Sequence, residues 1–211
     1  MRVLTNKIIT TKDHKNYWKT RDLDWKSAYF DTHNHPHRDL LIGELRKLKF
    51  NSVIEVGCAA GANLYRIKQA FPNVLIGGVD LNEKATETAR NLLPKGTLID
   101  TMSADDLFFN SKHTDIILTD ACLIYIGPSK IKKALREFKR LARKYVVLVE
   151  IYSANPIVQF LIWRRNGYFV YNYPRLLRKL GFRDIQMVKI PKWAWPDTGW
   201  HTYGRIIIAR P

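Results

Sequence analysis

Cysteine is scarce in this sequence, and long apolar runs are missing. Two cysteines, Cys58 and Cys122, occur among 211 residues. Two cannot build a disulfide framework, and no neighbouring residues pair them as metal ligands. No stretch approaches the ~20 apolar residues that span a bilayer, and residues 1–7 lack the apolar core of a secretory signal. We therefore expect no transmembrane segment and a location in a reducing cytoplasm.

Acidic side chains are in the minority. Lys and Arg total 35 against 19 Asp and Glu, which gives a formal net charge of +16. This balance favours polyanions as partners: nucleic acid, anionic lipid, or phosphorylated and acidic substrates. The charge is spread along the chain, so a basic surface that only aids solubility is an equal alternative. The length and a hydrophobic content of 46% predict one globular domain with a sizeable core.

The stretch 52–63 is the one around which the rest of the chain is organised. It begins as a β-branched apolar run and breaks into small residues between Gly57 and Gly61. Leu64, Ile67 and Phe71 follow at helical spacing. Strand, small-residue turn and helix form the opening unit of a nucleotide-binding α/β sheet. We expect the backbone N–H groups of this turn to face the ligand.

Acidic residues recur where predicted strands end. Further strands are predicted over residues 74–80, 97–102, 114–120, 145–150, 183–189 and 203–209. Glu55 lies near the end of the first strand, Asp80 and Asp120 end later ones, and Asp105 follows the third. Ligands of parallel sheets bind outside the carboxyl ends of the strands, so these four acids are predicted to face one ligand.

The remaining segments complete a sheet with a cap. We predict a cap over residues 1–36 and the main domain over 37–211, beginning with a helix after Pro36. The last two strands have no predicted helix between them and should pair as an antiparallel hairpin. The apolar segment 155–165 is open to two interpretations, a packing helix or a substrate lid.

This plan resembles the class I S-adenosylmethionine-dependent methyltransferases from about residue 37 onward. The matching residues are the motif 55–61, Asp80, Asp105 and Asp120. The resemblance implies a Rossmann-like, doubly wound α/β sheet of seven strands, mostly parallel with a C-terminal antiparallel hairpin, plus the N-terminal helical cap. Ala59 stands where the family usually has glycine, and a left-handed φ is costly for alanine.

The resemblance also implies the residues that bind the cofactor, S-adenosyl-L-methionine. They are Glu55, Gly57, Cys58, Ala59, Gly61, Asp80, Leu81, Ala104, Asp105, Asp120 and Ala121. By position, Asp80 holds the ribose, Leu81 packs on the adenine, and Asp105 accepts from the adenine amino group with Ala104 beside it.

The methionine end of the cofactor is assigned in the same way. The resemblance places the 57–61 backbone against the methionine part, with Glu55 organising the loop or the amino group. It places Asp120 and Ala121 along the methyl-donor end.

Catalytic residues are harder to find, because the cofactor itself carries the reactive methyl group. Tyr125, Glu150 and His201 are candidates by position alone. The histidines His33 and His35, with a third two residues further on, invite a metal hypothesis, but no acid or cysteine set completes a site, so no metal is predicted.

We therefore expect a methyltransferase that acts on an oxygen or nitrogen atom of a small, acidic or phosphorylated acceptor. The expected acceptor pocket is formed by Trp18, Trp25, Tyr29, Phe30 and the segments 155–173 and 191–201. Arg164, Arg165 and His201 are the groups expected to contact an acidic group on the acceptor.

Two alternatives stay open. The first is a nucleic-acid-methylating enzyme, although neither an Asn/Asp-Pro-Pro-Tyr motif nor a Pro-Cys is present, since Cys122 follows Ala121. The second is a non-catalytic, cofactor-binding partner subunit. A nicotinamide dehydrogenase is remote, because the first turn lacks Gly-x-Gly-x-x-Gly spacing. The oligomeric state is not predicted.

Overall fold

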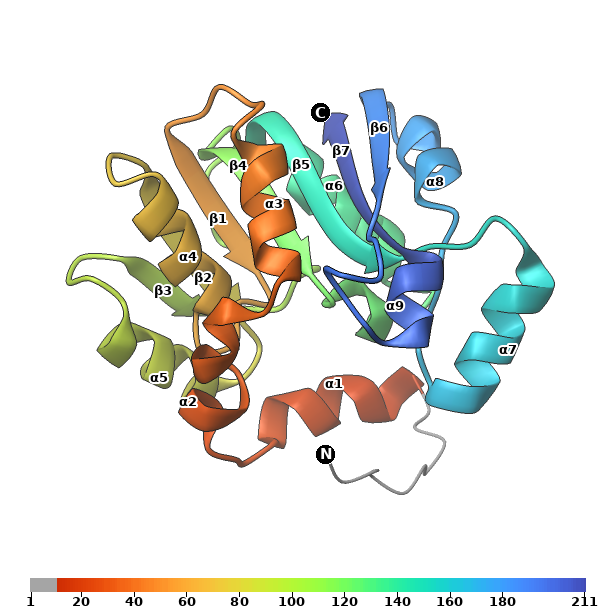
Figure 1. Cartoon of the computed structure of the whole chain (residues 1–211), viewed down its shortest axis with the longest axis horizontal. Coiled ribbons are helices and arrows are strands. Elements are labelled where there is room, and N and C mark those ends of the chain that lie inside the picture. The colour runs from red at the N-terminus through yellow and green to blue at the C-terminus, as the bar shows by residue number, and fades with distance from the viewer. Residues whose placement is uncertain (1–10) are drawn as a thin grey trace.

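A single seven-stranded sheet forms the centre of the molecule (Figure 1). The computed structural model describes residues 11–211, so the targeting prediction for residues 1–7 lies outside the described residues. The strands are β1 Ser52–Val56, β2 Leu75–Asp80, β3 Leu98–Thr101, β4 Thr114–Asp120, β5 Ala142–Ile151, β6 Arg183–Lys189 and β7 Gly204–Arg210. Their order is β3-β2-β1-β4-β5-β7-β6. Because β7 is antiparallel to both β5 and β6, the predicted mostly parallel sheet with an antiparallel end is confirmed.

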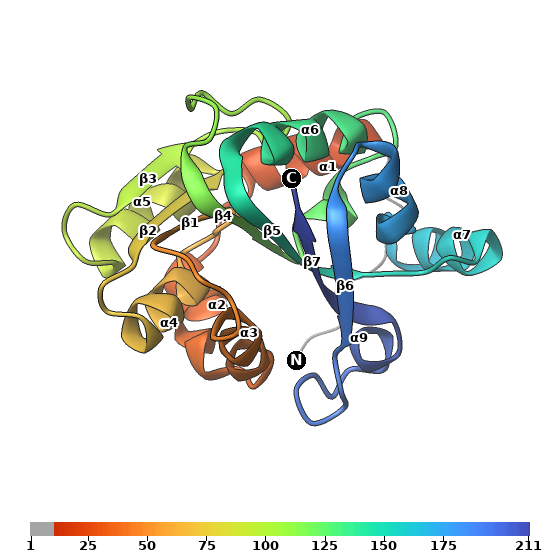
Figure 2. The same ribbon diagram turned by 90° about the horizontal axis from the view of Figure 1, so that it is seen from above.

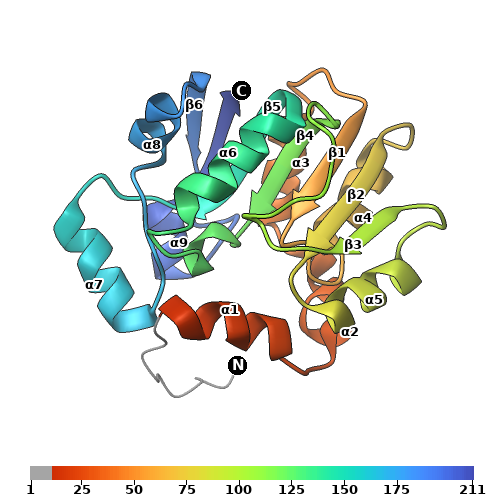
Figure 3. The same ribbon diagram turned by 180° about the vertical axis from the view of Figure 1, so that it is seen from behind.

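Helices cover both faces of this sheet (Figures 2 and 3). They are α1 Thr11–Thr20, α2 Trp25–Ala28, α3 His37–Leu45, α4 Ala62–Ala70, α5 Glu83–Leu92, α6 Ile131–Leu141, α7 Pro156–Asn166, α8 Tyr173–Lys179 and α9 Thr198–Tyr203, with the 3₁₀ turns η1 Phe30–Asn34 and η2 Leu123–Tyr125. The helices α3, α4 and α5 pack in one core cluster, and α6 and α8 pack in a second. The fold is therefore a doubly wound α/β sandwich.

Burial on both faces explains why the central strands are apolar runs rather than alternating patterns. In β4 the residues Ile116, Ile117 and Leu118 are all fully buried, with neighbours pointing to opposite clusters. Such strands favour β-branched and aliphatic residues along their whole length. Polarity returns where β4 ends, at Asp120.

The expectation of no helix between the last two strands is wrong. Helix α9 begins after Asp197, whose Oδ1 accepts hydrogen bonds from the N–H groups of Gly199 (2.9 Å) and Trp200 (3.2 Å). Trp200 is buried and stacks on Trp195, with ring centroids 3.9 Å apart. This cap and tertiary burial outweigh the loop-like Trp, Pro and Gly composition of the segment.

The edge strand β6 is irregular. Its pairing with β7 shifts register between Arg183 and Gln186, and Asp184 between them has φ +49°. Neighbouring strands do not add readily to such a bulged, charged edge.

The N-terminal helices lie beyond the carboxyl ends of the parallel strands (Figure 1). Trp25 and Phe30 form a buried cluster with Ala60 of the turn after β1 and Ala85 of α5. The segment is thus a helical cap, as predicted, and it covers the glycine-containing turn. The division of the chain at residue 36 stays a prediction.

Candidate active site

The turn between β1 and α4 is built from left-handed residues. Gly57, Ala59 and Gly61 have φ of +81°, +47° and +86°. A Cβ on Gly57 would lie 2.6 Å from Sγ of Cys122, and one on Gly61 would lie 2.7 Å from Leu93. Glycine is required at these two positions by both conformation and space. Ala59, which stands where the family usually has glycine, adopts the left-handed form despite its Cβ.

Most N–H groups of the turn are directed into the protein. The amides of Gly57 and Cys58 donate to the carbonyl of Val79 at 2.7 and 3.0 Å, and the amide of Ala59 donates to Oδ2 of Asp80 at 2.9 Å. The expectation that they face the ligand is therefore wrong for these three. The turn instead offers close backbone approach beside an acidic side chain.

Asp80 lies at the end of β2, where the ribose was expected. Its Oδ1 accepts the amide of Asn82 at 2.9 Å, and burial raises the pKa of its carboxyl group. Each carboxylate oxygen has two lone pairs, so both still have capacity for a ribose hydroxyl. Leu81 follows directly and is half-buried.

Asp105 is buried after β3 and is already paired. Its Oδ1 accepts from the Ser103 hydroxyl at 2.6 Å, and its Oδ2 lies 3.0 Å from Nζ of Lys130. Burial alone would raise the pKa of Asp105, but the Ser103 and Lys130 hydrogen bonds hold it below its ordinary value. Ala104, its neighbour, is half-buried.

Three side chains meet where β1 and β4 end. Nδ2 of Asn63, in the first turn of α4, donates to Oε1 of Glu55 at 2.6 Å and to Oδ2 of Asp120 at 2.9 Å. Within residues 14–211, Oε2 of Glu55, Oδ1 of Asn63 and Oδ1 of Asp120 are buried without a hydrogen-bond partner. Burial raises the pKa of Glu55 to about 8. Unsatisfied buried oxygens require a donor, and the ammonium group of a methionine brings three donors with a positive charge. These unpartnered acceptor oxygens therefore fit the methionine end of the expected cofactor.

Asp120 is also bonded from the opposite side. Nε2 of His37, the first residue of α3, lies 2.8 Å from Oδ2 of Asp120, and both side chains are almost fully buried. Burial would raise the pKa of Asp120, but the His37 contact and the Arg38 charge hold it below its ordinary value. Ala121, next in the chain, has φ +54°, a strained conformation of the kind that concentrates at functional sites.

The histidine pair was not predicted at this site. Nδ1 of His37 lies 2.6 Å from Nδ1 of His35, and the ring of Trp195 packs at centroid distances of 4.3 Å from His37 and 5.1 Å from His35. The alternating histidines were a visible signal, but only the fold brings them to Asp120. Asn63 was missed as well, although it lies two residues after Gly61.

The candidates chosen by position alone lie elsewhere. Oε1 of Glu150 accepts from the Thr119 hydroxyl and from the amides of Cys122 and Leu123, so Glu150 supports the turn after β4. Nδ1 of His201, in α9, lies 3.3 Å from the carbonyl of Pro196, in the loop just before that helix. Neither contact involves the expected cofactor residues.

Tyr125 and the aromatic residues expected to form the acceptor pocket lie partly in the cap and partly near Asp120. Tyr125 packs on Trp18 of α1, with centroids 4.8 Å apart, and burial raises its pKa well above the ordinary value. Tyr29 stacks on Trp25 at 5.2 Å inside the cap. Helix α7 stands apart from the sheet (Figure 1) and none of its residues is fully buried, but partly buried Ile162 packs against the larger core cluster. Both interpretations of the segment, a packing helix and a substrate lid, stay predictions. Of the expected segments, the 191–201 loop reaches the site through Trp195.

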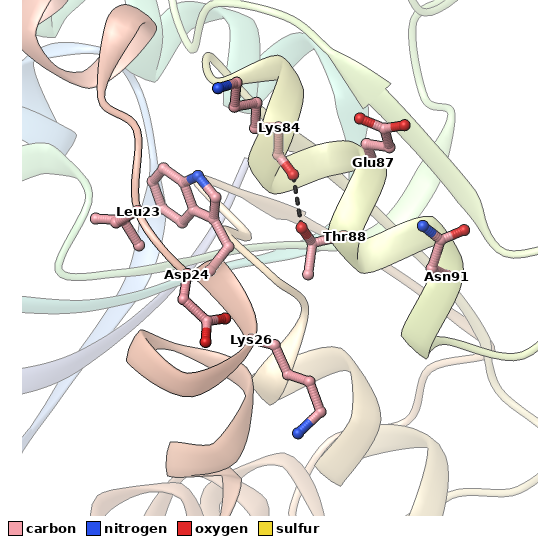
Figure 4. Close-up of a pocket in the computed structure, with 8 residues that line it drawn as sticks. Leu23, Asp24, Lys26, Lys84, Glu87, Thr88 and Asn91 are labelled. Carbon is pink, nitrogen blue, oxygen red and sulfur yellow. Dashed lines mark hydrogen bonds between the residues drawn. The ribbon is translucent and has the colours of Figure 1, made fainter.

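A surface depression of about 380 Å³ lies between α2 and α5 (Figure 4). Its lining residues are Leu23, Asp24, Trp25, Lys26, Lys84, Glu87, Thr88 and Asn91. None of them belongs to the set predicted to bind the cofactor, so we do not assign the depression to the site.

The described part of the chain lacks two kinds of feature, a metal-binding cluster and a membrane-spanning helix. Over the described residues, no group of three or more His, Cys, Asp or Glu side chains is placed to hold a metal ion. Among the helices described, none has the length and apolar character needed to cross a membrane.

Comparison with known proteins agrees with this geometry. Residues 53–145 match the family model of the methyltransferase domain. No curated protein matches the chain.

Solved structures share the fold at low sequence identity. A putative O-methyltransferase from Nostoc punctiforme is 17% identical, with a TM-score of 0.70 over 89% of this chain and 60% of that one. A putative methyltransferase in complex with the Haloferax volcanii Trm112 methyltransferase activator is 13% identical, with a TM-score of 0.68 over 94% of this chain and 96% of that one. Magnesium protoporphyrin IX methyltransferase from Synechocystis, with SAH bound, is 16% identical, with a TM-score of 0.63 over 95% and 98%. The family match over residues 53–145 therefore marks a methyltransferase domain in this part of the chain, and the described chain shares its fold with solved structures of methyltransferases, one of which was solved with SAM bound and with SAH bound.

Proposed function

We propose that this methyltransferase acts on an oxygen or nitrogen atom of a small acceptor. The observation that carries the proposal is the enclosure of Asp120, the residue expected at the methionine end of the cofactor. Buried His37 and the ring of Trp195 cover it from one side, and the N-terminal cap covers the neighbouring turn. A small molecule suits so covered a site better than a polymer does.

The protein's share of the chemistry is alignment and exclusion of water. When bound, the cofactor supplies an electrophilic methyl group, whose carbon–sulfur bond breaks with its electron pair staying on sulfur as the acceptor bonds to carbon. Glu55, Asn63 and Asp120 would hold the methionine end, and Asp80 the ribose. The aromatic cap and Trp195 would keep water from the reacting atoms.

The test is tritiated methyl transfer from labelled S-adenosylmethionine into a fractionated cell extract. We expect label in molecules below about 1 kDa, and none with Asp80→Ala. Label confined to macromolecules would contradict a small acceptor. Cofactor binding without transfer into any fraction would favour a non-catalytic, cofactor-binding partner subunit, the second alternative that the sequence leaves open.

The net charge of +16 supports a nucleic-acid substrate as the second candidate. The basic face of α6 is the obvious patch, yet much of it is engaged within the protein. Arg140 donates to the carbonyls of Leu107 and Phe109, and Lys139 donates to those of Leu180 and Gly181. Such side chains are less free to neutralise phosphates.

Binding of mixed oligonucleotides at 50 and 200 mM salt separates the two candidates. A protein that makes several phosphate contacts loses orders of magnitude in affinity over that range. We expect weak binding without a steep salt slope. Tight binding that falls about 10³-fold would favour the nucleic-acid alternative.

A further inference from the structure

We propose that His35, His37 and Asp120 form a relay that receives the proton lost by the acceptor during methyl transfer. The relay rests on the proposed function, because only an acceptor with an O–H or N–H group has such a proton to lose. It assigns His35 as the catalytic base, and His37 and Asp120 as the positioning residues that stabilise the added charge.

The hydrogen positions in the relay follow from its acceptors. The carboxylate of Asp120 is ionised and only accepts, so Nε2 of His37, 2.8 Å away, must carry a hydrogen. In neutral His37 the lone pair is then on Nδ1. Nδ1 of His35, 2.6 Å from it, is then the donor, and the backbone N–H of His37, which approaches this nitrogen at 3.5 Å, is too distant to compete. The lone pair of His35 is left on its own Nε2. His35 is the partly exposed member of the three, whereas His37 and Asp120 are buried.

Adding one proton reverses the central hydrogen bond without moving a heavy atom. The proton enters at Nε2 of His35, and the hydrogen on Nδ1 of His35 passes to Nδ1 of His37. His37 becomes an imidazolium against the carboxylate of Asp120, while His35 ends neutral. The gain in charge is thus carried to the buried carboxylate, as a histidine and aspartate couple does in other catalytic sites.

The surrounding charges favour one added proton rather than two. Arg38 of α3 lies near both His35 and Asp120, while Glu55 of β1 and the Asn63 amide of α4 adjoin Asp120 from the other side. Burial, the neighbouring His37 and Arg38 all lower the pKa of His35. These groups disfavour a second positive charge beside His37.

Every proton and electron pair in the transfer step is accounted for by the acceptor, the methyl donor and His35. The acceptor's O–H or N–H bond breaks and its proton moves to Nε2 of His35. The electron pair left on the acceptor forms the new bond to the methyl carbon, and the carbon–sulfur pair stays on sulfur. No further reactant is needed.

The first test uses nitrogen-15 histidine NMR of the full chain, which needs no acceptor. We expect His37 as the Nε2–H tautomer at pH 8, and a single proton taken up jointly by His35 and His37 on acidification. Asp120→Asn should lower the pH of that uptake by at least one unit. His113→Gln, at an exposed histidine that stacks on Phe109, is the control and should leave the pair unchanged.

Two results would overturn the relay. One is His37 as the Nδ1–H tautomer. The other is a His37 titration that does not change in His35→Gln, since this would show that the two rings do not share the proton. Neither result depends on whether the acceptor class is correct.

The second test separates a proton relay from a clamp that only fixes α3 to β4. Gln replaces His37 as a donor to Asp120 but takes up no proton. With the acceptor fraction from the labelling experiment, His37→Gln and His35→Gln should each lower kcat by about 10²-fold or more. They should also flatten its rise with pH, and leave SAH affinity within threefold. Lost SAH affinity with an unchanged pH profile would assign a clamp instead. A wild-type protein that transfers no label would refute the proposed function, while the NMR result would still decide the proton sharing.

Discussion

Gly57 and Cys122 contact each other across the gap between the turn after β1 and the end of β4. In Gly57→Ala the new Cβ would meet Sγ of Cys122 at 2.6 Å, with φ at +81°. We expect a loss of about 2 kcal/mol or more in the free energy of unfolding, measured in urea at pH 7.

Gly43 provides the matched control for that substitution. It lies inside α3, and a Cβ there meets nothing within 4 Å. Gly43→Ala should stabilise the protein by about 0.5–1 kcal/mol, because alanine loses less backbone entropy in a helix. Equal effects of the two substitutions would show that the Gly57 turn is not built as described.

Glu150 makes the stability depend on pH. Burial raises its pKa to about 8 in the folded protein, from an ordinary value of 4.5. Between these two values the folded state binds more protons than the unfolded state, so this contribution to stability falls as pH rises from 5 to 8. In Glu150→Gln the amide oxygen still accepts the three hydrogen bonds. The free energy of unfolding of the variant, relative to that of the wild type, should therefore increase with pH by as much as about 1.4 kcal/mol per pH unit over that range.

Urea unfolding at pH 5, 6, 7 and 8 measures this difference. Glu87→Gln, on the exposed surface of α5, should run parallel to the wild type. Parallel curves for Glu150→Gln would mean that Glu150 is ionised in the folded protein at pH 5.

The sequence predicted the acids at the strand ends but not their partners. Glu55, Asp80, Asp105 and Asp120 could be placed because a parallel sheet brings its carboxyl ends to one edge. His37 could not, because its bond to Asp120 joins residues 83 apart in the chain. No local periodicity reports such a contact, and their roles toward the cofactor stay predictions.

At the scale of elements, strands were easier to predict than short helices. β4 and β6 have the predicted bounds, since buried apolar runs and flanking turns mark them locally. Helix α9 escaped because its six residues depend on the Asp197 cap and on the burial of Trp200. Helix α7 has a helical start at Asn155 and Pro156, but nothing local shows that no residue in it is buried.

The attachment of the cap depends on one side chain of α5's N-terminus. Nδ2 of Asn82 donates to the carbonyls of Trp18 and Arg21, both at 2.8 Å, while its Oδ1 caps the helix at the amide of Ala85. Asn82→Asp keeps the helix cap but sets a carboxylate against two carbonyl oxygens. We expect amide hydrogen exchange across residues 14–21 to accelerate about 10-fold or more, which corresponds to about 1.4 kcal/mol or more.

Asn155→Asp is the control, since Oδ1 of Asn155 caps α7 at the amide of Ile157 in the same way. In Asn155→Asp, amide hydrogen exchange across residues 14–21 should be as slow as in the wild type. Unchanged exchange in Asn82→Asp would mean that packing of Trp25 and Phe30 alone holds the cap.

At the scale of the whole molecule, ligand binding should stabilise sheet and cap together. SAH at 100 times its Kd should add about 2.7 kcal/mol to the free energy of unfolding. One coincident transition is expected by tryptophan fluorescence, to which Trp18 and Trp25 of the cap contribute together with four tryptophans of the main domain, and by far-ultraviolet circular dichroism, which reports the helices and the sheet. Asp80→Ala should remove the gain, because Asp80 lies where the ribose is expected.

Asp22→Asn is the control for this measurement, since Asp22 forms an exposed pair with Lys84. It should keep the whole ligand-dependent gain. Stabilisation of Asp80→Ala equal to that of the wild type would remove Asp80 from the ligand site.

The irregular pairing of β6 has a consequence for how this protein behaves when concentrated. An open sheet border can recruit further chains edge to edge and grow into fibres, and the opposite border, β3, is only four residues long. The left-handed Asp184 and the register shift beside it interrupt the ladder that an incoming chain would extend. Crowded solutions of this protein should therefore resist polymerisation along either margin of the sheet.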